Sequence, residues 1–131
     1  MAIVGIGTDL VEIDRIEDAL RRFGDRFVDR ILGPDERMRY EARKARVARR
    51  GVTYLATRFA AKEAVSKALG LGMRQPMSWR AVELINAPSG APMAVAHGAL
   101  ADYLRARRLT LHVSVSDERS LAMAYAIAEQ T

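Results

Sequence analysis

The sequence predicts an α+β fold in which antiparallel strands pack with a long central helix. The middle of the chain, residues 34–69, carries apolar residues at helical spacing, with an alanine-rich stretch near its end. Residues 3–10 and 109–128 instead carry short apolar runs, and a polar turn at residues 117–120 divides the second range into a hairpin. Helices gathered in the middle of a chain, with antiparallel strands around them, are typical of the α+β class.

The length and composition indicate one compact domain, residues 1–131, in which half of the residues are hydrophobic. The chain has no cysteine, which excludes disulfide bonds and thiolate metal sites. It also shows no long apolar run, signal peptide or lipidation motif. We therefore expect a cytoplasmic protein with no membrane partner.

The N-terminal segment, residues 3–10, is predicted to be a buried strand. Alternation along a strand places Gly5, Gly7 and Asp9 on the same face. Asp9 is then near the end of the strand, on a face that two glycines leave bare. Considered alone, it is most simply explained as a capping or turn aspartate. A functional role requires a second carboxylate nearby in space, for which Glu63 is the obvious candidate.

The next segment is predicted to be a short amphipathic helix that begins at a capping box, Asp14 to Glu17, and ends at Gly24. Its outer surface, continued through residues 25–31, carries arginines beside apolar groups. These residues are Arg15, Arg22, Arg26 and Arg30, with Phe27 and Val28. A solvated surface is the simplest explanation, but arginines that flank exposed apolar groups also suit an acidic helical partner.

A strongly basic stretch follows on a helix that is predicted to begin at Pro34 and to continue into the central helix. Residues 37–50 hold seven basic residues and one acidic residue, and the whole chain has a net charge of +5. This stretch could be a solvated face, a nucleic-acid-binding patch or one wall of a phosphate pocket. Apart from Tyr40 and Tyr54 it lacks interleaved aromatic residues, which disfavours single-strand binding. A basic nucleic-acid-binding module nevertheless remains the main alternative function.

Residues 58–72 combine cations, a carboxylate, a hydroxyl and two glycines on one helical segment. Its predicted polar side comprises Lys62, Glu63, Ser66, Lys67 and Gly70, whereas the opposite side is rich in alanine. An ordinary solvated face with one i,i+4 ion pair would also explain these residues. However, lysines suit phosphate, a glutamate suits magnesium, and unpaired N–H groups at Gly70 to Gly72 would suit an anion. The sequence therefore favours a phosphate-and-metal site, with Asp9 as the second carboxylate.

The C-terminal half supplies the remaining strands. Residues 80–85 and 92–96 are predicted to form a hairpin around the polar turn at residues 86–90. Residues 97–108 form a helix, and residues 109–116 and 121–128 form the closing hairpin.

Four blocks of the sequence, in this order and over nearly the whole chain, resemble a known family. They are GIGTDLVEIDRI, RFAAKEAVSKALGLG, NAPSGAP and HVSVSDERSLAMA. The chain is similar to the holo-[acyl-carrier-protein] synthases, which are small bacterial 4'-phosphopantetheinyl transferases. The resemblance implies the phosphopantetheinyl transferase fold, assembled as a homotrimer with active sites between subunits.

The resemblance also implies an activity. The 4'-phosphopantetheine arm of coenzyme A would be transferred to a serine hydroxyl of apo-acyl carrier protein, with release of adenosine 3',5'-bisphosphate, in support of fatty acid biosynthesis. Asp9 and Glu63 would bind Mg²⁺, and Lys62 would neutralise charge on the leaving phosphate. Neither nucleic acid nor a membrane has a role in this activity. A non-catalytic coenzyme A binding protein remains a second alternative, and the base that activates the serine stays open.

The remaining implied contacts fall into two groups. The coenzyme A contacts are Arg50, Arg58, Ser66, Lys67, Gly70, Asn86, Pro88, Gly90 and Ser116. The carrier-protein contacts are Arg15, Arg22, Arg26 and Phe27. The sequence departs from the family pattern at Asp117, where many members have histidine. An aspartate cannot donate a hydrogen bond to a ribose phosphate, so Ser116 or neighbouring arginines are expected to take that role.

Overall fold

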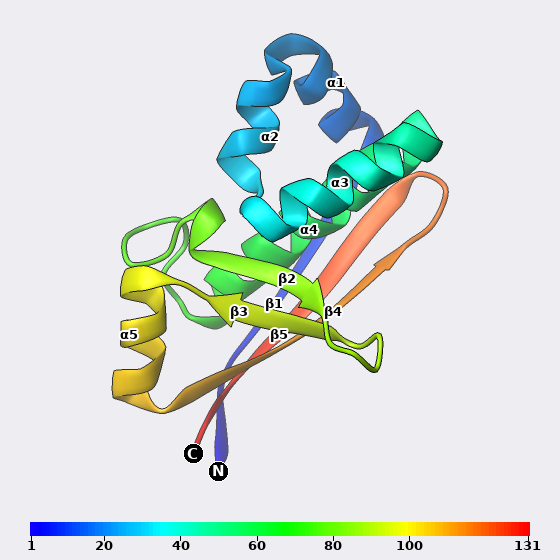
Figure 1. Ribbon diagram of the computed structural model, residues 1–131. Coiled ribbons are helices and arrows are strands. Elements are labelled where there is room, and N and C mark those ends of the chain that lie inside the picture. The colour runs from blue at the N-terminus through cyan, green and yellow to red at the C-terminus, as the bar shows by residue number, and fades with distance from the viewer.

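The computed structural model describes residues 1–131 and contains two antiparallel sheets (Figure 1). The larger sheet has the strand order β1-β5-β4, formed by β1 (Ala2–Glu12), β5 (Leu121–Gln130) and β4 (Leu109–Asp117). The smaller sheet pairs β2 (Val82–Asn86) with β3 (Pro92–Ala96). The α+β class and both predicted hairpins are confirmed, but the strands form two sheets rather than one.

The helices come mainly between β1 and β2. They are α1 (Ile13–Phe23), α2 (Asp25–Ile31), α3 (Pro34–Arg46), α4 (Ala48–Ala68) and, after β3, α5 (Gly98–Arg107), with a short 3₁₀ helix η1 (Trp79–Ala81). The predicted capping box of the first helix is wrong, because α1 begins at Ile13 and no side chain caps it. The predicted continuous helix is interrupted at Val47, whose backbone is extended.

The central helix α4 packs on the inner face of the large sheet, against β1 and β5, and also contacts α3 (Figure 1). Small residues on both elements allow this close packing. On the sheet side lie Gly5, Gly7, Ala122, Ala124, Ala126 and Ala128; on the helix side lie Ala60, Ala61, Ala64 and Ala68. A Cβ atom added to Gly7 would lie 2.0 Å from the Ala64 carbonyl oxygen. The strand therefore approaches the helix closely enough to place residues at its end beside the helix surface.

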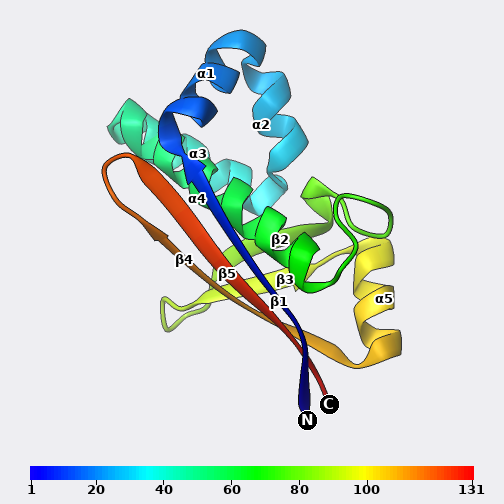
Figure 2. The same ribbon diagram turned by 180° about the vertical axis from the view of Figure 1, so that it is seen from behind.

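The outer face of the large sheet is uncovered, in contrast to the predicted buried strand. Val4, Ile6, Leu10 and Tyr125 are each at least half exposed. Figure 2 shows the molecule from the side on which β1, β5 and β4 lie in front of the helices. The strand is thus buried on one face only. None of the helices has the length and apolar character that crossing a membrane would require.

Candidate metal and phosphate site

Asp9 and Glu63 line one open cavity of about 300 Å³, which we call the carboxylate cavity. Asp9 lies on β1 and Glu63 on α4, and the close packing at Gly5 and Gly7 brings these two elements together. The other lining residues are Leu10, Val11, Arg15, Ile16, Ala19, Phe27 and Phe59. The predicted proximity of Asp9 and Glu63 is therefore present in the structure.

Lys67 provides a cation next to this pair of carboxylates. Its Nζ donates a hydrogen bond to the Thr8 carbonyl oxygen at 2.9 Å and lies 3.3 Å from Asp9 Oδ1. Partial burial, and then the negative charge of Asp9, raise the pKa of Glu63, while Lys67 opposes this shift. One lysine thus compensates only part of the charge of two nearby carboxylates, which favours a further cation in the cavity.

The donor set fits a magnesium ion that shares its coordination with a phosphate. Asp9 and Glu63 supply hard carboxylate oxygens from two separate elements. No group of three or more histidine, cysteine or acidic side chains is arranged to hold a metal by protein ligands alone. Magnesium commonly binds through one or two carboxylates together with substrate phosphates and water. The cavity therefore suits a metal that arrives with, or is completed by, a phosphate ligand.

Lys62 is not on the open face with Glu63, and this prediction is wrong. Both Lys62 and its partner Glu36 are fully buried; Lys62 Nζ lies 2.6 Å from Glu36 Oε1 and also donates to the Ile31 carbonyl oxygen. Burial lowers the pKa of Lys62, and Glu36 opposes this shift. Because α4 is covered on nearly all sides, helical periodicity does not distinguish a solvent-exposed face from a buried face on this helix. Direct contact of Lys62 with a bound phosphate is incompatible with this burial.

Ser66 and the glycine turn are also engaged within the protein. Ser66 is buried and its Oγ donates to the Glu63 carbonyl oxygen at 2.7 Å. The Gly70 N–H donates to the Lys67 carbonyl oxygen, and the Gly72 N–H donates to the Ser66 carbonyl oxygen. The predicted unpaired N–H groups are therefore absent, because they terminate α4. A helix C-terminus also presents the negative end of the helix dipole, which is unfavourable for an anion.

Several arginines meet at a second cavity of about 380 Å³, which we call the arginine cavity. Its lining residues are Arg43, Arg49, Arg50, Thr53, Tyr54, Thr57, Arg58, Val115 and Asp117. The Arg58 guanidinium stacks 4.1 Å from the centre of the Tyr54 ring, and that of Arg43 lies 4.6 Å from it. Arg58 Nε and the Tyr54 hydroxyl are buried without hydrogen-bond partners. Buried donors without partners, together with several positive charges, are the features of a site for an anion.

The basic stretch at residues 37–50 is divided between structural pairs and this cavity. Arg37 pairs with Asp25, Asp29 and Glu41. Arg49, which also reaches the arginine cavity, lies within 4 Å of acidic oxygens on α1. Of the three interpretations left open by the sequence, a wall of a phosphate pocket agrees best with this distribution. The contributions of Arg43, Tyr54 and Thr57 were not predicted, because only the fold brings them together.

The other predicted coenzyme A contacts lie outside both cavities. Asn86 ends β2, and Pro88 and Gly90 lie in the exposed turn that follows, where the Gly90 N–H donates to the Ala87 carbonyl oxygen. Ser116 lines a small cavity with Leu10 and Met123, at the edge of the outer sheet face. Within one chain these residues do not reach the carboxylate cavity.

The predicted carrier-binding residues lie around the carboxylate cavity. Arg15 and Phe27 line that cavity directly. Phe27 and Arg26 also line a neighbouring cleft, and Arg22 stacks over Phe23 at 5.7 Å. The three arginines are exposed and take part in no ion pair. A positively charged surface therefore borders the two carboxylates.

Comparisons with known proteins identify the family. Residues 5–126 match the model of the 4'-phosphopantetheinyl transferase superfamily. The holo-[acyl-carrier-protein] synthase of Cupriavidus taiwanensis is 58% identical over 129 residues, which cover 98% of this chain and 92% of the relative. The protein of the same name from Cupriavidus pinatubonensis is 57% identical, with 98% and 91% covered.

Solved structures agree with this assignment. The holo-[acyl-carrier-protein] synthase of Neisseria meningitidis has a TM-score of 0.90 and 37% identity, covering 98% of this chain and all of that chain. The enzyme of Bacillus anthracis, solved in complex with coenzyme A (3',5'-ADP), has a TM-score of 0.79 and 34% identity, with 98% of each chain covered. With its family model, its relatives and its fold in agreement, the chain belongs to the holo-[acyl-carrier-protein] synthases of the 4'-phosphopantetheinyl transferase superfamily.

Proposed function

We propose that this protein transfers the 4'-phosphopantetheine arm of coenzyme A to a serine hydroxyl of apo-acyl carrier protein, and so supports fatty acid biosynthesis. The observation that supports this most directly is the pair of carboxylates, Asp9 and Glu63, in one cavity beside Lys67. The reaction forms a bond between the serine oxygen and the β-phosphorus of coenzyme A. It breaks the pyrophosphate bond, whose electron pair leaves with adenosine 3',5'-bisphosphate, and the serine hydroxyl loses its proton.

In this proposal Asp9 and Glu63 would hold Mg²⁺ beside the pyrophosphate of coenzyme A. When bound, the ion would stabilise the negative charge that builds up on the leaving phosphate. Lys67 bridges Asp9 and the Thr8 carbonyl oxygen, and so holds the Asp9 carboxylate in position. Lys62 is proposed to act without touching the ligand. Its buried ion pair with Glu36 holds α4 in place, and α4 carries the adjacent Glu63.

The arginine cavity is proposed to receive the phosphate on the ribose of coenzyme A. Arg58 is held rigidly by Tyr54 and Thr57, and Arg50 is exposed at the same cavity. Arginine suits this role because its planar donors match phosphate oxygens. Asp117 also lines the cavity and cannot donate to a phosphate, so the arginines supply the binding contacts there.

The carrier protein is proposed to dock through an acidic helix on the surface of α1 and α2. Arg15, Arg22 and Arg26 are exposed without acidic partners, and Phe27 supplies an apolar contact among them. Charges of this kind guide association and orientation. Arg15 also lines the carboxylate cavity, so a carrier on this surface would present its serine near Asp9 and Glu63.

We further propose that residues 1–131 form one phosphopantetheinyl transferase domain that assembles as a homotrimer. The uncovered outer sheet face supports an assembly, since Val4, Ile6, Leu10 and Tyr125 expose apolar surface on three paired strands. The carboxylate and arginine cavities share no lining residue. In the proposed trimer, a ligand that needs both cavities is bound between one subunit and the next.

The proposed function is tested by mass spectrometry of apo-acyl carrier protein incubated with this protein, coenzyme A and magnesium. The expected result is a carrier heavier by one phosphopantetheine group, formed only with magnesium. Asp9→Ala and Glu63→Ala should each abolish most of the mass shift while the proteins stay folded. Coenzyme A binding without any mass shift would instead indicate a non-catalytic binding protein.

A further inference from the structure

Glu83 on β2 is a buried carboxylate that lies outside both cavities, next to the ion pair of Lys62 and Glu36. Its Oε2 accepts hydrogen bonds from the backbone N–H groups of Asp35 and Glu36, each at 3.0 Å. In return, Glu36 Oε2 accepts a hydrogen bond from the Leu84 N–H of β2 at 2.9 Å. Each glutamate thus binds the backbone of the element that carries the other, and together they hold β2 against the N-terminus of α3.

Glu83 also supplies the N-terminal cap that α3 lacks in its own sequence. The residue at the N-cap position is Gly33, which has no side chain. A Cβ atom added to Gly33 would collide with the Glu83 carboxyl group, so the glycine leaves the space that this carboxylate occupies. A negative charge is favourable there, because the first N–H groups of a helix have no partners within it and the helix dipole is positive at that end.

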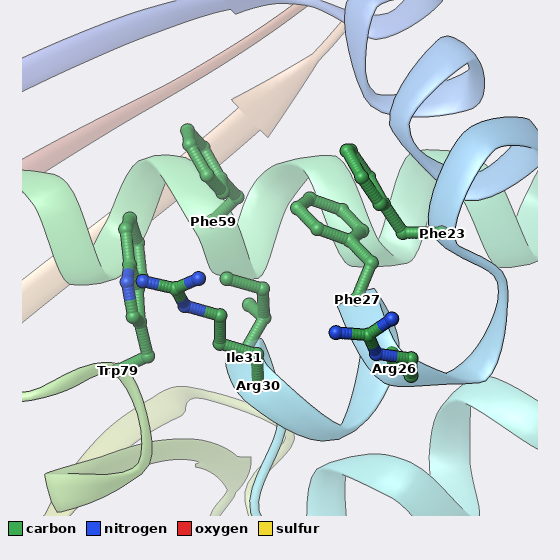
Figure 3. A pocket seen from close by; sticks show the side chains of 7 residues that line it. All are labelled: Phe23, Arg26, Phe27, Arg30, Ile31, Phe59 and Trp79. Atoms are coloured by element: carbon green, nitrogen blue, oxygen red, sulfur yellow. The ribbon is translucent and has the colours of Figure 1, made fainter.

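On its inner side, this network reaches the helix that carries Glu63. Glu36 Oε1 accepts from Lys62 Nζ at 2.6 Å, and the same Nζ donates to the Ile31 carbonyl oxygen. Figure 3 shows the Ile31 side chain directed from the end of α2 toward α4. Lys62 immediately precedes Glu63 on α4. Glu36 therefore fixes α4 at the position next to the proposed metal ligand, and Glu83 fixes the backbone of Glu36.

On its outer side, the network ends at His97, whose side chain is half exposed. Nε2 of His97 lies 2.8 Å from Glu83 Oε1, and the histidine is the donor because an ionised carboxylate only accepts hydrogen bonds. The His97 backbone N–H donates to the Ala81 carbonyl oxygen at 2.8 Å, which ties the histidine to η1. Both oxygens of Glu83 are thereby engaged, one with His97 and the other with α3.

We propose that Glu83 is a positioning residue for Glu63, and that His97 holds the Glu83 carboxylate in the required orientation. The proposal rests on the proposed function, which assigns Glu63 to Mg²⁺. Asp9 is on β1, so the distance between the two proposed metal ligands depends on where α4 lies. Magnesium requires nearly ideal octahedral geometry, whereas the attraction between an arginine and a phosphate changes little over a small displacement. A change at Glu83 or His97 therefore weakens magnesium-dependent binding more than magnesium-independent binding.

Calorimetry of coenzyme A binding, with magnesium and with a chelator, measures the gain in affinity that magnesium provides. Direct partners of metal ligands typically contribute about 10–100-fold to metal affinity, and His97 acts through further groups, so His97→Ala should reduce this gain by about threefold to tenfold. His97→Gln should restore most of the gain, because its amide keeps an N–H donor. Glu83→Gln keeps the shape but removes the charge, and should reduce the gain more than His97→Ala does.

Asp102→Asn on α5 is the control, because it disrupts an exposed ion pair with Arg105 and should leave the gain unchanged. Melting temperatures identify the variants that are folded during the assay. If Glu83→Gln does not fold, His97→Ala at its half-exposed position decides the test. A structural role alone would lower the melting temperature and leave the gain at the wild-type value. That result, or an equal loss of affinity with and without magnesium, would overturn the proposal.

The outcome is separable from that of the proposed function. Calorimetry needs no turnover, so a selective loss of the magnesium-dependent gain supports the positioning role even if no carrier protein is modified. Transfer of the arm by the wild type, together with an unchanged gain in His97→Ala, overturns the positioning role alone. Absence of any gain with magnesium in the wild type overturns the metal assignment and the positioning role together.

Discussion

Gly7 on β1 lies directly against Ala64 on α4, so closely that a Cβ atom on the glycine would sit 2.0 Å from the Ala64 carbonyl oxygen. The same strand carries Asp9 two residues later, on the same face, and the same helix carries Glu63 one residue earlier. The close contact between backbones therefore controls the position of the two carboxylates relative to each other.

Replacing Gly7 by alanine should damage both the fold and the site. The added methyl group must separate β1 from α4, and overpacking of this kind costs at least about 1–3 kcal/mol. We expect a lower unfolding free energy in urea and weaker magnesium binding by calorimetry. Thr8→Ala, on the exposed face of the same strand, is the matched control and should change stability little. Wild-type stability in Gly7→Ala would contradict the observed packing.

Breaking the buried pair of Lys62 and Glu36 should destabilise the protein strongly. Both side chains are fully buried, so Lys62→Met leaves Glu36 as an uncompensated charge, at a cost of about 3–5 kcal/mol. The double variant Lys62→Met/Glu36→Gln should recover part of this loss, because neither member of the pair is then charged, although an amide can accept from only one of the Gly33 and Leu84 N–H groups. Lys67→Met, at a half-exposed pair, should cost only about 0–1 kcal/mol. A double-mutant cycle in urea measures these values, and strictly additive losses would argue against the pair.

The titration of Glu63 predicts how stability depends on pH. Its folded-state pKa is raised above the ordinary value of 4.5, mainly by burial and then by Asp9. Between these two values the folded protein binds more protons than the unfolded chain, so this residue makes stability fall as pH rises through that window. Glu63→Gln lacks this contribution. The difference in unfolding free energy, wild type minus variant, should therefore decrease with rising pH, measured in urea with a chelator present. An increase would contradict the assignment.

The fold was predictable where the signals are local. The closing hairpin, for example, follows from two apolar runs and a polar turn at residues 117–120. The break between α3 and α4 at Val47 was not predictable, because no proline or glycine marks it. The nearby Gly51 lies close to Lys44, where an added Cβ would be 2.9 Å from the Lys44 Cβ. The break thus accompanies a close crossing of α3 and α4, which depends on packing rather than on local propensity.

The site was predictable for Asp9 and Glu63, because alternation along the strand places Asp9 and helical periodicity places Glu63. It was not predictable for Lys62, because its partner Glu36 lies 26 positions away and the helix is buried almost all round. Only some residues of the arginine cavity were predicted from the sequence. Arg50 and Arg58 were implied by family resemblance, whereas Tyr54 joins them through stacking that no sequence pattern reports.

Charge reversal on α1 should weaken carrier binding selectively. Arg22→Glu removes a positive charge from an exposed position without breaking an ion pair. The KM for carrier protein should rise while that for coenzyme A stays constant. The effect should shrink with added salt, since exposed charges are screened within about 8–10 Å at physiological ionic strength. Arg105→Glu, on α5, is the control and should leave both constants unchanged. A rise confined to coenzyme A would show that the docking surface is misplaced.

Subunits should complement one another if each active site joins the carboxylate cavity of one chain to the arginine cavity of the next. Glu63→Ala and Arg58→Ala should each be inactive alone, and a mixture that is dissociated and reassembled should regain part of the activity. At some interfaces of the mixed trimer, an Arg58→Ala chain supplies the intact carboxylates and a Glu63→Ala chain supplies the intact arginines. Because Arg58 is 7% exposed and packs on Tyr54, Arg50→Ala serves as a second, exposed variant. Native mass spectrometry verifies that subunits have exchanged. Confirmed exchange without recovered activity would mean that each site is built within a single chain.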